Sequence, residues 1–160
     1  MPKVNFKLQT HLALALVCLT AISSALAQTP TSNPKFDMDA AQRLGADQRG
    51  MRSYVLVLLK TGPNKVAAGK ERDEMFAGHF ANINRLAAQG KLALAGPFDG
   101  IDGWRGLFIF AVKDIEEAKQ LTATDPVIVK GEMIAEYHQW YGSAAVMDIA
   151  RIHETLIEKK

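Results

Sequence analysis

The stretch YVLVLL at residues 54–59 decides the fold that this sequence predicts. It is apolar at both odd and even positions, so a strand made from it is expected to be buried on both faces. Gly62 and Pro63 then end that strand. The stretch LFIFAV at residues 107–112 repeats the pattern. We therefore expect two central strands in a sheet whose two faces both need covering.

Weaker patterns place the remaining elements around these two strands. Four are expected: a helix over 69–89, a short strand over 91–95, a helix that Asp114 caps and that ends near Thr124, and an edge strand over 132–140. The order βαββαβ is the split unit of ferredoxin-like folds. In that topology the first and third strands are central, which are the positions of the two apolar stretches. The sequence predicts an α+β, ferredoxin-like fold with a four-stranded antiparallel sheet.

The first residues have the pattern of a secretory signal. A start with Lys3 and Lys7 is followed by an apolar run over 12–22 and by small residues at both signal-peptidase positions, Ala25 and Ala27. Residues 1–27 are therefore predicted to be a signal peptide that is removed from a secreted or periplasmic protein. The alternative is an uncleaved anchor helix, but the run is short for a membrane span. The only cysteine, Cys18, lies in this segment, so the mature chain has no thiol chemistry.

The rest of the chain divides into three parts. Residues 28–52 are predicted to be a flexible N-terminal segment with a short helix at 39–48, residues 53–141 the folded domain, and residues 142–160 a C-terminal helix with an apolar stripe. Either that helix or a second subunit is expected to cover the helix-free face of the sheet, and we expect a homodimer. Residues 28–160 carry no formal net charge, which argues against binding nucleic acid.

His79 is the candidate catalytic residue. It lies three residues after Phe76 and four before Ile83, on the stripe that the first helix turns toward the sheet. A histidine there is either a buried neutral side chain bonded to backbone or a base that needs a carboxylate. Asp125 is the best candidate for that carboxylate, because the ends of the two helices lie close together in this topology. An Asp before Pro126 equally suits a second role, in which it accepts from nearby backbone amides.

Other patterns that carry chemistry are weak. The sequence has no phosphate loop, dinucleotide fingerprint, zinc-protease motif or nucleophile elbow. The Asp-rich loop at 99–103 lacks the ligand spacing of a calcium site and is interpreted as a polar hairpin. A metal site would require His79, His138 and Asp125 to converge. We therefore predict neither a metal nor a cofactor.

Two blocks of the sequence resemble the YCII-related (YciI-like) family. In the first block, Gly78-His79-Phe80, Gly90-Lys91-Leu92 and the AGPF stretch at 95–98 are similar to the family's helical His, Gly-x-Leu turn and Ala-Gly-Pro strand end. In the second block, Thr124-Asp125-Pro126 and the strand that ends at Trp140 are similar to its Asp-Pro and last strand. The resemblance implies a ferredoxin-like fold that dimerises sheet to sheet, as in dimeric α/β barrels. It also implies a His and Asp pair, which carries over onto His79 and Asp125.

The resemblance further implies proton-transfer chemistry on a small, cyclic or aromatic molecule. A relative of this fold removes chloride from a chlorinated hydroxyquinone, and similar barrels include muconolactone isomerases. We expect a lyase or isomerase in which His79 abstracts a proton while Asp125 orients it. Four residues at the strand ends are expected to form the pocket wall: Gly96, Pro97, Trp104 and Arg105. The Trp and Arg side chains suit an anionic or aromatic ligand, or they cover the end of the sheet.

The alternative hypothesis is a non-catalytic protein of the same fold. In that case the chain is a small-ligand-binding or structural homodimer, and His79 and Asp125 are hydrogen-bonded core groups.

Overall fold

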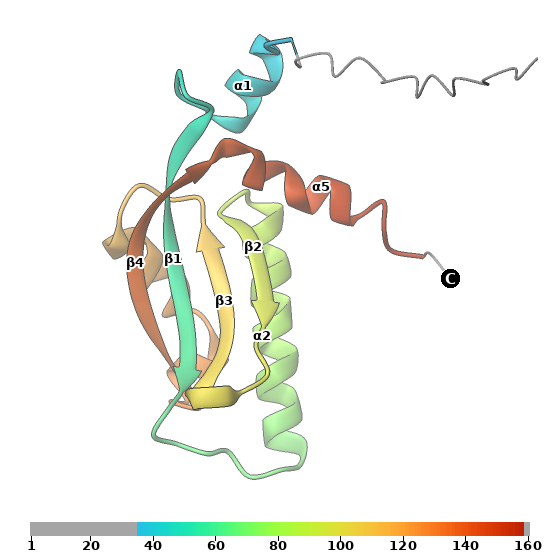
Figure 1. Cartoon of the computed structure of the whole chain (residues 1–160). Coiled ribbons are helices and arrows are strands. Elements are labelled where there is room, and N and C mark those ends of the chain that lie inside the picture. Colours follow the sequence, from blue (N-terminus) through green and yellow to red (C-terminus); the bar gives the residue numbers. More distant parts are fainter. Residues whose placement is uncertain (1–34, 159–160) are drawn as a thin grey trace, which may run out of the picture. The chain divides into compact units, whose positions relative to one another are not determined.

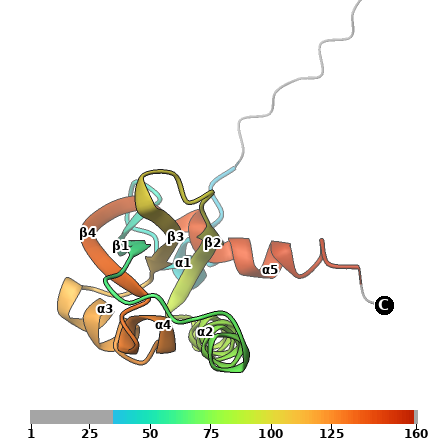
Figure 2. The same cartoon turned by 90° about the horizontal axis from the view of Figure 1, so that it is seen from below.

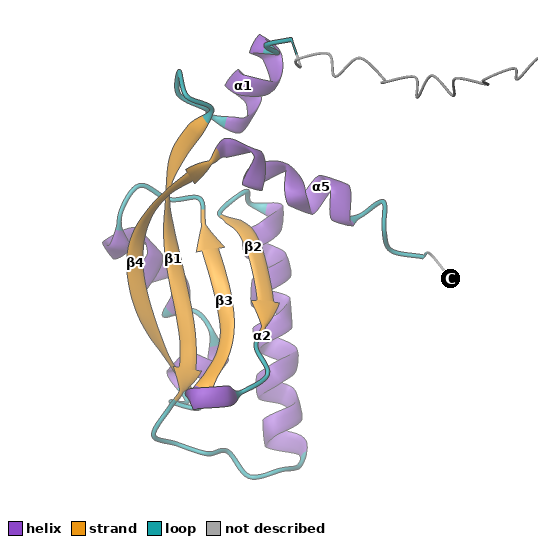
Figure 3. Cartoon of the chain, in the orientation of Figure 1, coloured by secondary structure: helices purple, strands orange, loops and turns teal. Residues whose placement is uncertain are grey.

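The computed structural model describes residues 35–158 and contains one four-stranded antiparallel sheet (Figures 1 and 3). The strands are β1 (Met51–Thr61), β2 (Leu92–Pro97), β3 (Trp104–Phe110) and β4 (Met133–Ser143). Their order across the sheet is β2-β3-β1-β4, and every neighbouring pair is antiparallel. The two strands that the apolar stretches predict to be central are therefore central. This confirms the α+β, ferredoxin-like fold.

Three helices lie on one side of this sheet (Figure 2). They are α2 (Lys70–Ala88), α3 (Ile115–Thr122) and α4 (Pro126–Val129). From β1, the side chains of Val55, Val57 and Leu59 point toward them and are almost completely buried. From β3, Phe108 and Phe110 join the same core. The main hydrophobic core thus lies between the sheet and these helices.

The other face of the sheet is covered at one end only. Tyr54, Ala93 and Ile109 are buried there against the 3-10 helix η2 (Ala144–Asp148), which contributes Val146 and Met147. Farther along β1, Leu56 and Leu58 point to the same face and remain half-buried. An apolar part of this face is therefore open in the single chain.

The N-terminal part of the described chain is more ordered than the flexible segment predicted over 28–52. Helix α1 (Met38–Leu44) begins where the Asp37 side chain accepts from the amide of Ala40 and ends at Gly45, whose φ is 66°. The first strand begins at Met51, inside the segment predicted to be flexible. These caps stabilise α1, which begins within one residue of the start predicted for a short helix at 39–48 and ends four residues earlier. Residues 28–34 and the predicted signal peptide over 1–27 lie outside the described residues.

The C-terminal helix predicted over 142–160 is present only in part. Strand β4 continues to Ser143, and the 3-10 helix η2 leads into the short helix α5 (Ile149–His153). Beyond it, Leu156 and Ile157 stay exposed. The helix ends early because these last side chains bury too little apolar surface to offset the entropy lost on ordering the chain. None of the helices within residues 35–158 has both the length and the apolar character needed to cross a bilayer.

Candidate active site

Helix α2 carries two polar side chains on its buried face. Met75, His79, Asn82 and Leu86 are buried and recur at the spacing of a single helical stripe. Met75 and Leu86 pack into the main core. The sequence pattern predicted His79 on this stripe, and the structure adds Asn82 to it. The spacing of three residues from His79 was the signal that Asn82 shares its face, and both side chains need interior hydrogen-bond partners.

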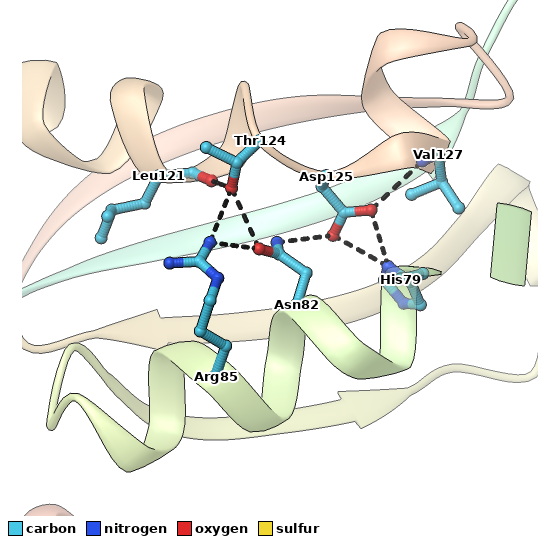
Figure 4. A network of polar contacts seen from close by, with 7 residues as sticks. All are labelled: His79, Asn82, Arg85, Leu121, Thr124, Asp125 and Val127. Atoms are coloured by element: carbon cyan, nitrogen blue, oxygen red, sulfur yellow. Dashed lines mark hydrogen bonds and ion pairs between the residues drawn. The ribbon is translucent and has the colours of Figure 1, made fainter. Parts of the chain in front are cut away.

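Asp125 provides the partner of His79 (Figure 4). The Nδ1 atom of His79 lies 3.0 Å from Oδ1 and 2.9 Å from Oδ2 of this carboxylate, which is completely buried. Oδ1 also accepts from the amide of Val127 at 3.2 Å and thereby caps α4. Asp125 lies between α3 and α4 and has an extended backbone, as a residue before proline favours. This conformation directs its side chain to the start of α4. The carboxylate thus makes both of the contacts considered from the sequence, one with His79 and one with a backbone amide.

Gly78 permits the close approach of the two helices that carry this pair. A Cβ atom at position 78 would lie 2.9 Å from Cγ of Pro126, the first residue of α4. The proline ring is rigid and has no room to retreat without moving the backbone. Gly78 and Pro126 flank His79 and Asp125 in the sequence, so the same close contact sets the distance between imidazole and carboxylate.

A second layer of polar groups orients the carboxylate (Figure 4). The Nδ2 atom of Asn82 lies 3.5 Å from Oδ2 of Asp125. The Oδ1 atom of Asn82 accepts from Arg85 and, at 3.0 Å, from the hydroxyl of Thr124. Because these donors occupy the amide oxygen, the amide nitrogen must face Asp125. The carboxylate therefore receives donors from His79, Asn82 and Val127.

The contact with Asp125 fixes the tautomer of His79. A carboxylate offers only acceptor atoms, so Nδ1 carries the hydrogen and Nε2 has the free lone pair. Within residues 35–158, Nε2 has no hydrogen-bond partner. The imidazole stacks on Phe108, with ring centroids 6.0 Å apart, and contacts Phe80 at 5.4 Å. The ring is held in one orientation with its basic nitrogen unused.

His79 lines a cavity of about 440 Å³ on the helix side of the sheet. Most of the wall is apolar, and its largest side chains are Phe76, Phe80, Phe98 and Phe108. Among the described residues that form the wall, His79 and Arg105 have the only polar side chains. Such a cavity has the size and the mainly apolar lining of a small-molecule site.

Three of the four residues expected in the pocket wall line this cavity: Gly96, Pro97 and Arg105. Trp104 instead lies against Phe98, with ring centroids 5.4 Å apart, and lines a neighbouring hollow with Asp99 and Asp102. The structure therefore brings His79 together with the first three and places Trp104 outside their cavity.

A bulge in β3 brings Arg105 into the cavity. Leu59 of β1 pairs with Gly106, and the next residue, Lys60, pairs with Trp104. Arg105 is therefore an extra residue in β3, opposite the bond between Leu59 and Lys60. A bulge of this kind breaks the alternation of faces and re-aims the side chain.

Glu132 is a second buried charge beside the cavity. It lies directly before β4 and is only 3% exposed. Its Oε1 accepts from Arg72 at 2.6 Å and its Oε2 from the amide of Val66 at 2.7 Å. Burial raises the pKa of Glu132, but the hydrogen bonds from Val66 and Arg72 and the positive charges of Arg72 and Arg105 lower it more, so the pKa stays below its ordinary value of 4.5. The carboxylate is therefore ionised at neutral pH.

No sequence pattern predicts this pair of charges. Arg72 and Glu132 are 60 residues apart, and only the fold brings them together. Glu132 lies before an edge strand, and Arg72 lies near the start of a helix. Charged residues are common at both places, so neither gives a local signal of burial.

The third member of the metal site considered from the sequence lies elsewhere. His138 is paired with Leu56 in the sheet and so points to the open face, away from His79, where it contacts Glu136 at 2.7 Å. In the part of the chain that the structure describes, no three His, Cys, Asp or Glu side chains are gathered to hold a metal ion.

The fold and the site together define a class of protein: a ferredoxin-like α+β domain in which a buried His and Asp pair borders an apolar cavity. Comparison with known families identifies which one. The sequence profile of the YCII-related domain matches residues 53–140, more than half of the chain, and the chain belongs to this family.

Individual relatives are more distant. The uncharacterized protein YjpA of Bacillus subtilis (strain 168) is 27% identical over 90 residues, which are 56% of this chain and 95% of that protein. Among solved structures, the 5-chloro-2-hydroxyhydroquinone dehydrochlorinase of Burkholderia phenoliruptrix AC1100, in complex with 2,5-dihydroxybenzoquinone, is 21% identical. That comparison covers 54% of this chain and 92% of the other, with a TM-score of 0.42.

We predict that Gly78→Ala lowers the free energy of unfolding by about 1–3 kcal/mol, because the new methyl group overlaps Pro126. In an unobstructed helix the same change stabilises by about 1 kcal/mol. Urea denaturation measures the difference, and Asn84→Ala, at an exposed position of the same helix, is the control that should change little. A Gly78→Ala variant more stable than the wild type would contradict the close contact.

Proposed function

We propose that this protein is an acid-base enzyme, of the lyase or isomerase type, that acts on a small molecule in the His79 cavity. The observation that carries the proposal is the state of the imidazole. Its Nδ1 is fixed on a buried carboxylate, and its Nε2 has no partner among the described residues in a ring that borders an apolar cavity. This arrangement suits a general base.

In this proposal, Nε2 of His79 takes a proton from a carbon next to a carbonyl or from a ring hydroxyl of the substrate. The electron pair of the broken bond stays on the substrate, and the negative charge of Asp125 stabilises the imidazolium. In an isomerisation, the imidazolium returns the proton to another atom of the same molecule. In an elimination, the electron pair expels a leaving group, which departs as an anion, and the imidazolium then passes its proton to water.

We predict that His79→Gln and Asp125→Asn each lower the rate of proton exchange by about 10²- to 10⁴-fold. His79→Gln removes the base, and Asp125→Asn removes the charge that holds its tautomer. The assay follows the replacement of hydrogen by deuterium at ring positions of cyclic enols and hydroxyquinones by NMR. Circular dichroism shows whether each variant is folded, and Glu154→Gln on the exposed C-terminal segment is the control.

The two hypotheses predict different results in this experiment. Unchanged exchange in His79→Gln would contradict the enzymatic proposal. A wild type that binds these compounds without any exchange would favour the non-catalytic alternative, as would variants that unfold because a buried group has lost its partner.

We also propose that two copies associate through the open face of the sheet. Leu56 and Leu58 are half-buried on that face, and η2 covers only its other end. A second copy would remove this apolar surface from water, which is favourable in proportion to the area buried.

Light scattering on the purified protein is expected to give the mass of a homodimer at micromolar concentration. Leu58→Asp should give the monomer mass, because the association would then bury an unpaired charge. Val129→Asp changes an exposed apolar residue of α4 in the same way and should leave the dimer intact. A wild-type monomer would contradict the proposal.

The proposed location is the periplasm or the exterior of the cell, with residues 1–27 removed. The support is the charged start, the short apolar run and the small residues at Ala25 and Ala27. Mass spectrometry of protein exported by its native host is expected to find Gln28 as the first residue. Retention of Met1–Ala27 in most molecules would contradict both the cleavage and the location.

A further inference from the structure

We propose that the ligand of the His79 cavity is a small organic carboxylate with an apolar ring, and that Arg105 binds its carboxylate group. This inference rests on the proposed function of the same cavity, because it names the class of substrate on which His79 would act. It follows from the pairing of the charged groups around the cavity.

Arg105 is in an ion pair with Glu132, but its side chain has no hydrogen-bond partner among the described residues. Its guanidinium lies 3.9 Å from Oε1 of Glu132, which is too far for a hydrogen bond, and it makes no other side-chain hydrogen bond within residues 35–158. Only 26% of this side chain is exposed. A guanidinium has five N–H donors in a planar fork, so a half-buried one without acceptors has capacity for a ligand.

Glu132 does not accept a hydrogen bond from the N–H donors of Arg105. Its oxygens accept hydrogen bonds from other donors, one from Arg72 and the other from the amide of Val66. Arg72 is further held over the ring of Phe76, with its guanidinium carbon 4.9 Å from the ring centroid. Arg72 and Arg105 together carry two positive charges, and Glu132 carries one negative charge. Because Arg72 is hydrogen-bonded to Glu132, the excess positive charge is on Arg105 at the cavity wall.

The rest of the cavity wall strengthens the attraction of Arg105 for an anion. Apart from His79 and Arg105, its wall consists of apolar side chains and backbone. A low-polarity wall strengthens the attraction between opposite charges and weakens the competition from water. A carboxylate matches the guanidinium fork with two parallel hydrogen bonds, which a single hydroxyl cannot do.

The same wall defines the rest of the ligand. Four phenylalanine side chains and Ile83 line it, and its volume of about 440 Å³ is within the range of sites for single small molecules. A ligand anchored at Arg105 therefore has its apolar ring against these side chains. Its reacting C–H or O–H bond would face Nε2 of His79, the other polar group of the wall.

The experiment measures the binding of two probes of the same shape to the purified chain by calorimetry: benzoate, which is charged, and benzamide, which is neutral. We expect benzoate to bind at least about tenfold more tightly than benzamide, and this preference to weaken as salt is added. Arg105→Gln should remove the preference. Arg49→Gln removes an equal charge from the exposed loop before β1, far along the sheet from the cavity, and should preserve it.

Two further variants keep the result interpretable. Arg105→Lys retains the charge but not the fork and should recover only part of the benzoate affinity, and thermal unfolding of both Arg105 variants checks that they are folded. His79→Gln should still bind benzoate, because binding at Arg105 does not require proton transfer. Equal affinity for the two probes, no binding of benzoate, or unchanged benzoate affinity in Arg105→Gln would overturn the inference.

The two proposals can fail separately. If benzoate binding does not depend on Arg105 while deuterium exchange still depends on His79, the carboxylate inference is wrong and the proposed function stands. If benzoate binding depends on Arg105 while exchange does not depend on His79, the cavity is a carboxylate-binding site without the proposed chemistry.

Discussion

The buried contact between His79 and Asp125 is the interaction on which the arrangement of the helices depends. A carboxylate removed from water is costly unless donors surround it. Asp125 obtains those donors from two helices: the side chains of His79 and Asn82 belong to α2, and the amide of Val127 belongs to α4. The short helix α4 buries Val127 in the main core and packs Ile128 against it. Its position depends on this burial, on the carboxylate and on the contact between Gly78 and Pro126.

The segments outside the family domain form a second, smaller assembly at one end of the sheet. Residues 53–140 match the family, whereas α1, η2 and α5 lie before or after that range. Asp148 joins them, because it accepts from Arg43 of α1 at 3.0 Å and from Arg151 of α5 at 2.8 Å. The hydrogen bonds from Arg151 and Arg43 hold the pKa of Asp148 well below its usual range. One carboxylate thus connects both added ends of the chain, while η2 covers Tyr54 and Ile109.

The sequence predicted those features that depend on the pattern of neighbouring residues. The apolar stretches at 54–59 and 107–112 identified the two central strands, because only a strand covered on both faces tolerates such a composition. Helical spacing placed His79 on the inner stripe of α2. The Asp-Pro step predicted that the preceding helix ends near Thr124 and that Asp125 accepts from nearby backbone amides, and the family resemblance added the expectation that it meets the histidine.

The rest of the site depends on contacts between distant residues. No local pattern indicates that Glu132 accepts from Arg72 until α2 and β4 are packed together. The bulge was also hidden, because it is a property of the pairing between two strands rather than of either strand alone. The sequence therefore predicted Arg105 in the pocket wall without the reason for its position. It also predicted Trp104 in the same wall, whereas the structure places Trp104 in a neighbouring hollow.

Arg105 reaches the cavity because β3 has one residue more than its pairing with β1 requires. Its place in the cavity wall is therefore set by the length of the strand as much as by its own chemistry. Loss of the extra residue, which is Arg105 itself, would restore regular alternation and remove the positive charge, while the core side chains of β1 and β3 kept their partners. Insertions and deletions normally damage a central strand. At this position they can instead change which ligand the cavity binds. Diversification of such a cavity can proceed by changes of strand length as well as by substitution.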